Sequence, residues 1–284
     1  MSAGRHVGSG FLRALPFIAL ALGGPRPLHD LPGHELIGIA VFAVALACLW
    51  WVGAAAIARD GPAARARVLA GALLLAPSML IALLWVGLGA PFQATALENQ
   101  HRYLVLMVNA LLAGAGFLVL RDVLRERGER FFSSALLAAA IPASGLYLVC
   151  IAITLAQATM ALQGDRTPFP PILSHLYDAL EFFACALTYV CTALAAAAMG
   201  RAGLLGRTAV RVFVLLCLVI LVLLVLHGIE YPEISGRAAP WYTQPGVIVR
   251  IPAIPWVMPA LMGAMMLKPL PATTDVRPAP RPGA

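Results

Sequence analysis

The chain has 284 residues, of which 61% are hydrophobic and only 12% are charged. A soluble globular domain carries roughly 45–50% apolar and about 25% charged residues, so this composition excludes a water-soluble fold. The formal net charge of +7 does not indicate nucleic-acid binding, because the basic residues lie in short gaps and form no stripe with interleaved aromatic residues. The sequence therefore predicts an all-α, polytopic membrane protein whose partner is the lipid bilayer.

The N-terminal segment, residues 1–34, precedes the first long apolar segment. Arg5 and Arg13 precede a short apolar run, which ends near the small residues Ala19-Leu20-Ala21. This order of features is typical of a secretory signal peptide. Pro16 within the run favours the alternative, a helix lying in the membrane interface. Both alternatives stay open, and both place the segment on the periplasmic side.

Seven segments are long and apolar enough to cross a bilayer. A helix needs about 20 residues to span a hydrocarbon core of ~30 Å, and lipid requires that backbone groups be bonded within the segment. The sequence thus predicts a seven-transmembrane helix bundle over residues 35–268. Its spans are residues 36–58, 68–89, 103–120, 131–157, 173–199, 210–229 and 247–267. The proline-rich tail, residues 269–284, is predicted to be disordered and cytoplasmic.

The gaps between the apolar segments fall alternately on the two sides of the membrane. The charged residues are divided unequally between these two sets of gaps. Thirteen of the 20 Lys and Arg follow the odd-numbered segments, whereas all six His and eight of the 13 carboxylates belong to the other set. The positive-inside rule then predicts an outside N-terminus and an inside C-terminus. Arginine outnumbers lysine 19 to 1, which we interpret as the composition of a GC-rich bacterium and hence an inner-membrane location.

The fifth segment carries the strongest candidate for a functional site. At 100° per residue, one arc of its helix holds five polar or sulfur-containing side chains. They are Asp178, Glu181, Cys185, Thr188 and Thr192. A carboxylate inside a membrane is costly and rarely faces lipid, so this stripe is expected to face the bundle interior. Ser174 is the predicted N-cap of the helix.

A facing surface is predicted on the neighbouring segments. One face of the fourth segment carries Tyr147, Cys150, Thr154 and Gln157, and Asn109 lies within the third segment. Together these side chains predict an outward-opening polar cavity bounded by the third to sixth segments. The lead hypothesis is a metal-dependent membrane enzyme that acts at the periplasmic face on an undetermined small molecule or lipid.

Imidazole and carboxylate are the usual ligands of Zn, Mn and Fe, and helix bundles build metal sites from pairs spaced i and i+3. The predicted ligands of such a divalent metal are His101, His175, His227 and Glu230. The predicted catalytic carboxylates are Glu181 and Asp178. No H-E-x-x-H motif or P-loop occurs in the sequence.

Three alternatives stay open. A proton- or cation-coupled transporter or channel would use Glu181 and Asp178 as its ion sites. A haem protein would use two of the histidines as axial ligands, which is less favoured because no single span contains a histidine pair. An assembly subunit would use the polar stripes only for packing. The sequence indicates no particular protein partner.

Overall fold

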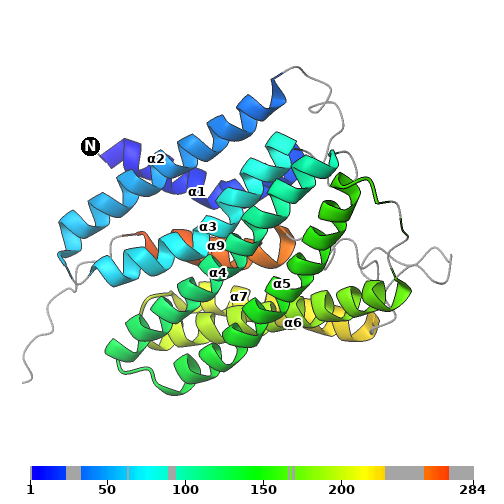
Figure 1. Ribbon diagram of the computed structural model, residues 1–284. Helices are drawn as coiled ribbons and strands as arrows, with labels where there is room; N and C mark the ends of the chain where they lie inside the picture. Colours follow the sequence, from blue (N-terminus) through cyan, green and yellow to red (C-terminus); the bar gives the residue numbers. More distant parts are fainter. Residues whose placement is uncertain are drawn as a thin grey trace, which may run out of the picture.

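The computed structural model describes residues 2–23, 33–62, 64–88, 94–165, 167, 170–227 and 253–268. These residues form helices and short turns, with no strand among them. The helices are α1 (Ser2–Gly23), α2 (His34–Asp60), α3 (Ala64–Leu88), α4 (Ala96–Glu126), α5 (Phe131–Leu162), α6 (Pro171–Arg201), α7 (Arg207–His227) and α9 (Ala253–Met266). Figure 1 shows the long helices side by side, with the short α9, in orange, among them.

Six helices, α2 to α7, are long and apolar enough to cross a membrane, as judged from the described residues. Their outer surfaces confirm this character, since Trp50, Val225 and Leu226 expose 78%, 73% and 69% of their area. A soluble monomer rarely exposes large apolar patches of this kind, whereas lipid covers them. The protein is therefore a multi-pass, all-helical membrane protein.

The predicted seventh span is only partly represented. Helix α9 has 14 residues and a length of ~21 Å, which is short for crossing the hydrocarbon core as one helix. Residues 247–252, which the sequence assigned to this span, lie outside the described residues. The count of seven spans, the orientation and the inner-membrane location stay predictions.

Helix α1 is part of the packed bundle. Leu12, Leu15 and Ala19 are buried in one cluster with Leu75 of α3 and Ala260 of α9. The sequence offered a signal-like segment or an interfacial helix for this region, and neither alternative anticipated that packing. The cause is tertiary, because α1 covers apolar surface that α3 and α9 leave open.

Five helices, α2, α3, α4, α6 and α7, begin earlier than the sequence predicted, and the cause is clear for two of them. Helix α4 begins at Ala96, because Thr95 and Glu98 form a capping box in which each side chain accepts the backbone N–H of the other residue. Helix α6 begins at Pro171, and proline is favoured at a first helical position. The prediction of Ser174 as N-cap is therefore wrong, because Ser174 lies inside the helix.

Helix α9 is bound to α3 at its C-terminal end. The buried Arg67 of α3 donates hydrogen bonds to the Met266 carbonyl, at 2.7 Å, and to the Lys268 carbonyl. Carbonyls at the end of a helix lack partners within the helix, so Arg67 satisfies this end of α9. The same guanidinium pairs with Asp60 at 2.5 Å and thereby also joins the end of α2.

The backbones of α3 and α9 touch at two glycines. A Cβ atom on Gly263 would lie 2.5 Å from the Gly71 carbonyl oxygen, and one on Gly71 would lie 2.8 Å from the Gly263 oxygen. Small residues allow membrane helices to approach this closely, which maximises van der Waals contact where no hydrophobic force drives helices together. Larger side chains at either position would separate the helices.

We expect Gly263→Ala to destabilise the protein by about 1–3 kcal/mol, the usual penalty of overpacking. The matched control is Gly145→Ala on α5, where an added Cβ would meet no atom within 4 Å. Thermal unfolding in detergent, followed by circular dichroism, measures both variants. Equal midpoints for Gly263→Ala and the wild type would contradict the close contact of α3 and α9.

The turn between α4 and α5 is attached to the end of α6 through Glu129. This buried carboxylate accepts a hydrogen bond from Arg201 Nε at 2.6 Å and another from the Phe132 N–H at 3.0 Å. Burial raises the pKa of Glu129, but the hydrogen bonds and the positive charge of Arg201 outweigh burial and hold that pKa below its ordinary value of 4.5. The folded protein is therefore more stable when Glu129 is ionised than when it is protonated.

The sign of this pKa shift predicts a loss of stability in acid. The contribution of Glu129 is complete above pH 4.5 and is lost as the pH falls through the lower folded pKa. We expect Glu129→Gln to lower the unfolding midpoint at neutral pH and to reduce its decline below pH 4.5. The control is Glu126→Gln, an exposed carboxylate on the same turn. Identical pH profiles for Glu129→Gln and the wild type would disprove the role of Glu129.

Candidate functional site

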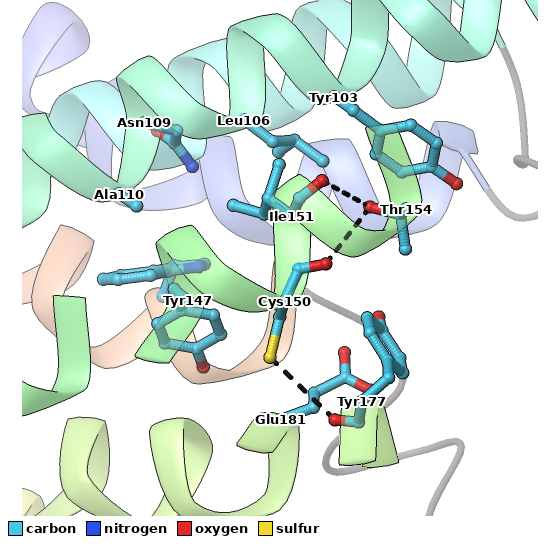
Figure 2. Close-up of a pocket in the computed structure, with 11 residues that line it drawn as sticks. Tyr103, Leu106, Asn109, Ala110, Tyr147, Cys150, Ile151, Thr154, Tyr177 and Glu181 are labelled. Carbon is cyan, nitrogen blue, oxygen red and sulfur yellow. Dashed lines mark hydrogen bonds between the residues drawn. The ribbon is translucent and has the colours of Figure 1, made fainter. Parts of the chain in front are cut away.

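A cavity of about 50 Å³ lies between α4, α5, α6 and α9. Its lining consists of Tyr103, Leu106, Asn109, Ala110, Tyr147, Cys150, Ile151, Thr154, Tyr177, Glu181 and Trp256 (Figure 2). A cavity needs roughly 10–15 Å³ to accept one water molecule, so this one has room for a few waters or a small ion.

Glu181 is the acidic residue of this lining. It lies ~15 Å along α6 from the first residue of that helix, and only 4% of its surface is exposed. Tyr177, one helical turn earlier, lies on the same side of α6 and also lines the cavity. Figure 2 shows the two side chains next to each other, on the side of the cavity opposite α4.

The polar stripe of α6 is buried along its whole length. Asp178, Glu181, Cys185, Thr188 and Thr192 are all buried, as the helical spacing predicts. The two threonine hydroxyls donate to carbonyls one turn earlier, at 2.8 Å in each case, so their own helix satisfies them. Within this stripe it is Glu181 that reaches the cavity.

Helix α5 forms the facing wall, as its own spacing predicts. The Cys150 thiol donates to the Tyr177 carbonyl across the gap between α5 and α6, at 3.9 Å. The Thr154 hydroxyl donates to the Ile151 carbonyl at 2.9 Å. Figure 2 shows both hydrogen bonds. These two donors are therefore engaged with backbone groups.

Two other polar atoms of the lining residues have no hydrogen bond within the described part of the chain. Among the described residues, neither the Asn109 Oδ1 atom nor the Tyr147 hydroxyl has a hydrogen-bond partner. Both residues are more than nine-tenths buried, with 2% and 6% of their surface exposed. Buried polar atoms are normally paired, and leaving one unpaired costs about 1–3 kcal/mol. Water or a polar ligand in the cavity would supply the missing partners.

Trp256 of α9 completes the lining. Its ring packs against the Tyr147 ring, with the ring centroids 5.1 Å apart and the planes tilted by 41°. Trp256 is buried, and it forms part of a core cluster with Ile81 and Leu84 of α3. Helix α9 therefore provides an apolar wall to a cavity whose polar groups come from the other three helices.

The other predicted site residues that the structure describes are not on this cavity. Asp178 is buried on α6, three residues before Glu181, whereas His101 and His175 are exposed on α4 and α6. The side chain of His227 and the whole of Glu230 lie outside the described residues.

The metal prediction finds no support in the part of the chain that the structure describes. No group of three or more His, Cys, Asp or Glu side chains in that part could hold a metal ion. Because His227 and Glu230 are not among those residues, a divalent Zn, Mn or Fe site stays a prediction, and so does the less favoured haem.

Sequence reasoning did not single out Tyr177 or Trp256. Tyr177 carried a readable signal, because a residue four positions before Glu181 must share its side of the helix. Trp256 carried none, because its position depends on how α9 packs against α3.

The comparisons with known proteins leave the cavity as the basis for arguing function. No family model matches the chain, and neither the curated proteins nor the solved structures provide a match.

We expect Tyr147→Phe to unfold within about 1 kcal/mol of the wild type, because the lost hydroxyl has no protein partner among the described residues. Tyr147→Ala should lose about 3–5 kcal/mol, the usual penalty of removing a buried aromatic ring. Thermal unfolding in detergent compares the two variants. A loss of stability in Tyr147→Phe as large as in Tyr147→Ala would show that the hydroxyl has a protein partner.

Proposed function

We propose that the protein is a proton- or cation-coupled membrane transport protein in which Glu181 takes up the proton or cation. The observation that carries this proposal is a carboxylate with 4% exposure, located on a small polar cavity inside a bundle of candidate membrane spans. An ionised carboxylate at such a position is costly unless a proton or a cation neutralises it. Carboxylates of this kind mark ion pathways and proton relays in membrane proteins.

The size of the cavity supports a small ligand. Sites for small organic molecules usually enclose about 300–1,000 Å³, whereas this cavity has about 50 Å³. A proton on Glu181, or a cation with a few waters, fits this space. The Asn109 Oδ1 atom and the Tyr147 hydroxyl supply oxygen atoms of the kind that bind water or a hard cation.

Asp178 extends the acidic surface toward the start of α6. It is buried and lies three residues before Glu181, which corresponds to ~4.5 Å along the helix and to the same side of it. In the proposed mechanism, Asp178 exchanges protons with the solution beyond the start of α6 and passes them to Glu181. The prolines inside α3, α5 and α9 (Pro77, Pro142 and Pro259) interrupt backbone hydrogen bonding and allow these helices to bend as the cavity opens.

The donor set favours this function over a metal-dependent enzyme. Catalytic zinc sites use three protein ligands, usually histidines and carboxylates. Among the described residues, the cavity lining contains a single carboxylate and no histidine. Its other polar groups, chiefly tyrosine and threonine hydroxyls, are suited to proton transfer and to hydrated cations.

We expect wild-type protein in liposomes to carry protons, Na⁺ or K⁺ in response to an imposed gradient. A trapped pH dye reports protons, and radioactive tracers report the two metal ions. Glu181→Gln should reduce the flux to the level of protein-free vesicles, because the amide cannot be charged. Glu126→Gln, an exposed carboxylate far along α4 from the cavity, should retain full flux.

Infrared difference spectroscopy provides an independent readout of the same residue. Titration of the wild type should show the carbonyl stretch of a buried protonated carboxyl group, and Glu181→Gln should lack that band. Wild-type levels of flux in Glu181→Gln would overturn the proposal. Absence of flux for all three ions, together with absence of the infrared band, would overturn it as well.

A further inference from the structure

A second and larger pocket opens between α2 and α3, and it shares no residue with the Glu181 cavity. Its volume is about 380 Å³. We call it the α2–α3 groove and define it by Leu46, Trp50, Gly53 and Ile57 of α2 together with Arg65 and Leu69 of α3. Apart from Arg65, these lining residues are apolar or glycine.

The length of the groove matches one leaflet of a bilayer. The lining residues of α2 run from Leu46 to Ile57, which corresponds to ~16 Å along the helix. One leaflet contributes about half of a hydrocarbon core that is ~30 Å thick. Gly53 and Ala54 line the middle of the groove. Because they are small, the groove stays open there, whereas larger side chains would fill it.

Positive charge lies at one end of the groove. Arg65 is the second residue of α3, next to the turn that follows α2, and its side chain is exposed. Among the described residues Arg65 forms no ion pair, whereas the neighbouring Arg67 engages Asp60. Arg59, at the end of α2, is also exposed. A guanidinium binds phosphate oxygens through two parallel hydrogen bonds, so this end is complementary to a phosphate group.

We propose that the α2–α3 groove is a binding site for an anionic phospholipid. One acyl chain lies along the groove against Trp50 and Leu69, and the phosphate binds Arg65 at the membrane interface. The groove is too small to receive a helix of a second copy, because 16 Å of a helix ~10 Å wide has about three times its volume. Excess positive charge at the groove end favours an anionic headgroup over a zwitterionic one.

Trp50 provides a reporter for this site because it lines the groove and is 78% exposed. Bromine atoms on an acyl chain quench the fluorescence of a tryptophan that they contact. The full chain is reconstituted in phosphatidylcholine with a small fraction of brominated lipid, either phosphatidylglycerol or phosphatidylcholine. The emission of Trp50 is obtained as the difference between the wild type and Trp50→Phe.

We expect brominated phosphatidylglycerol to quench Trp50 more strongly than brominated phosphatidylcholine at the same mole fraction. Arg65→Gln should abolish this preference, and high salt should weaken it, since the contact is electrostatic. The matched control is Arg125→Gln, which removes an exposed arginine at the end of α4 and should keep the preference. Circular dichroism and size-exclusion chromatography check that each of these variants, all at exposed positions, is folded.

Three results would overturn the proposal. The wild type would show equal quenching by the two lipids, or Arg65→Gln would keep the preference for phosphatidylglycerol. The third such result is a decrease in the quenching of Trp50 as the protein-to-lipid ratio rises, which would show that a second copy of the chain covers the groove.

Discussion

The attachment of α9 to α3 is the contact on which the candidate site depends. Arg67 binds the last carbonyls of α9, and the backbones of the two helices touch at Gly71 and Gly263. Ten residues and ~15 Å separate Met266 from Trp256, which lines the cavity at the other end of α9. A helix held at one end by buried hydrogen bonds thus positions an aromatic wall opposite Tyr147. Moving α9 would change the volume around Glu181.

Three of the five buried charged residues that the structure describes, Arg67, Glu129 and Glu181, differ in their surroundings. Arg67 is paired with Asp60 and two carbonyls, and Glu129 is paired with Arg201 and the Phe132 N–H. Such pairs offset the desolvation of a buried charge and hold helices together. Glu181 borders a cavity that Tyr177 also lines. The Glu181 carboxylate therefore has open space beside it, whereas protein groups enclose the Glu129 carboxylate.

Helix geometry explains why His101 and His175 do not join Glu181 at the cavity. Helices α4 and α6 each contain 31 residues and are ~46 Å long, so their ends extend beyond a hydrocarbon core of ~30 Å. His101 and His175 lie near the starts of these helices and are exposed. Glu181 lies ~9 Å deeper than His175 and about 120° away around the helix axis, at 100° per residue. The imidazole and the carboxylate therefore face different surroundings.

The sequence by itself determined the helical, membrane-embedded character of the protein and the polar faces of α5 and α6. Both are local properties. The length of the apolar segments indicates that lipid surrounds them, and the 3.6-residue period of a helix determines which side chains share a face. The early start of α4 was also local, because Thr95 and Glu98 form a readable capping box. Tertiary structure alone decided the packing of α1, the place of Trp256 and the volume of the cavity. Those features rest on contacts such as that of Arg67 with Met266, which are 199 residues apart, and periodicity within one helix carries no information about a neighbour so distant in the chain.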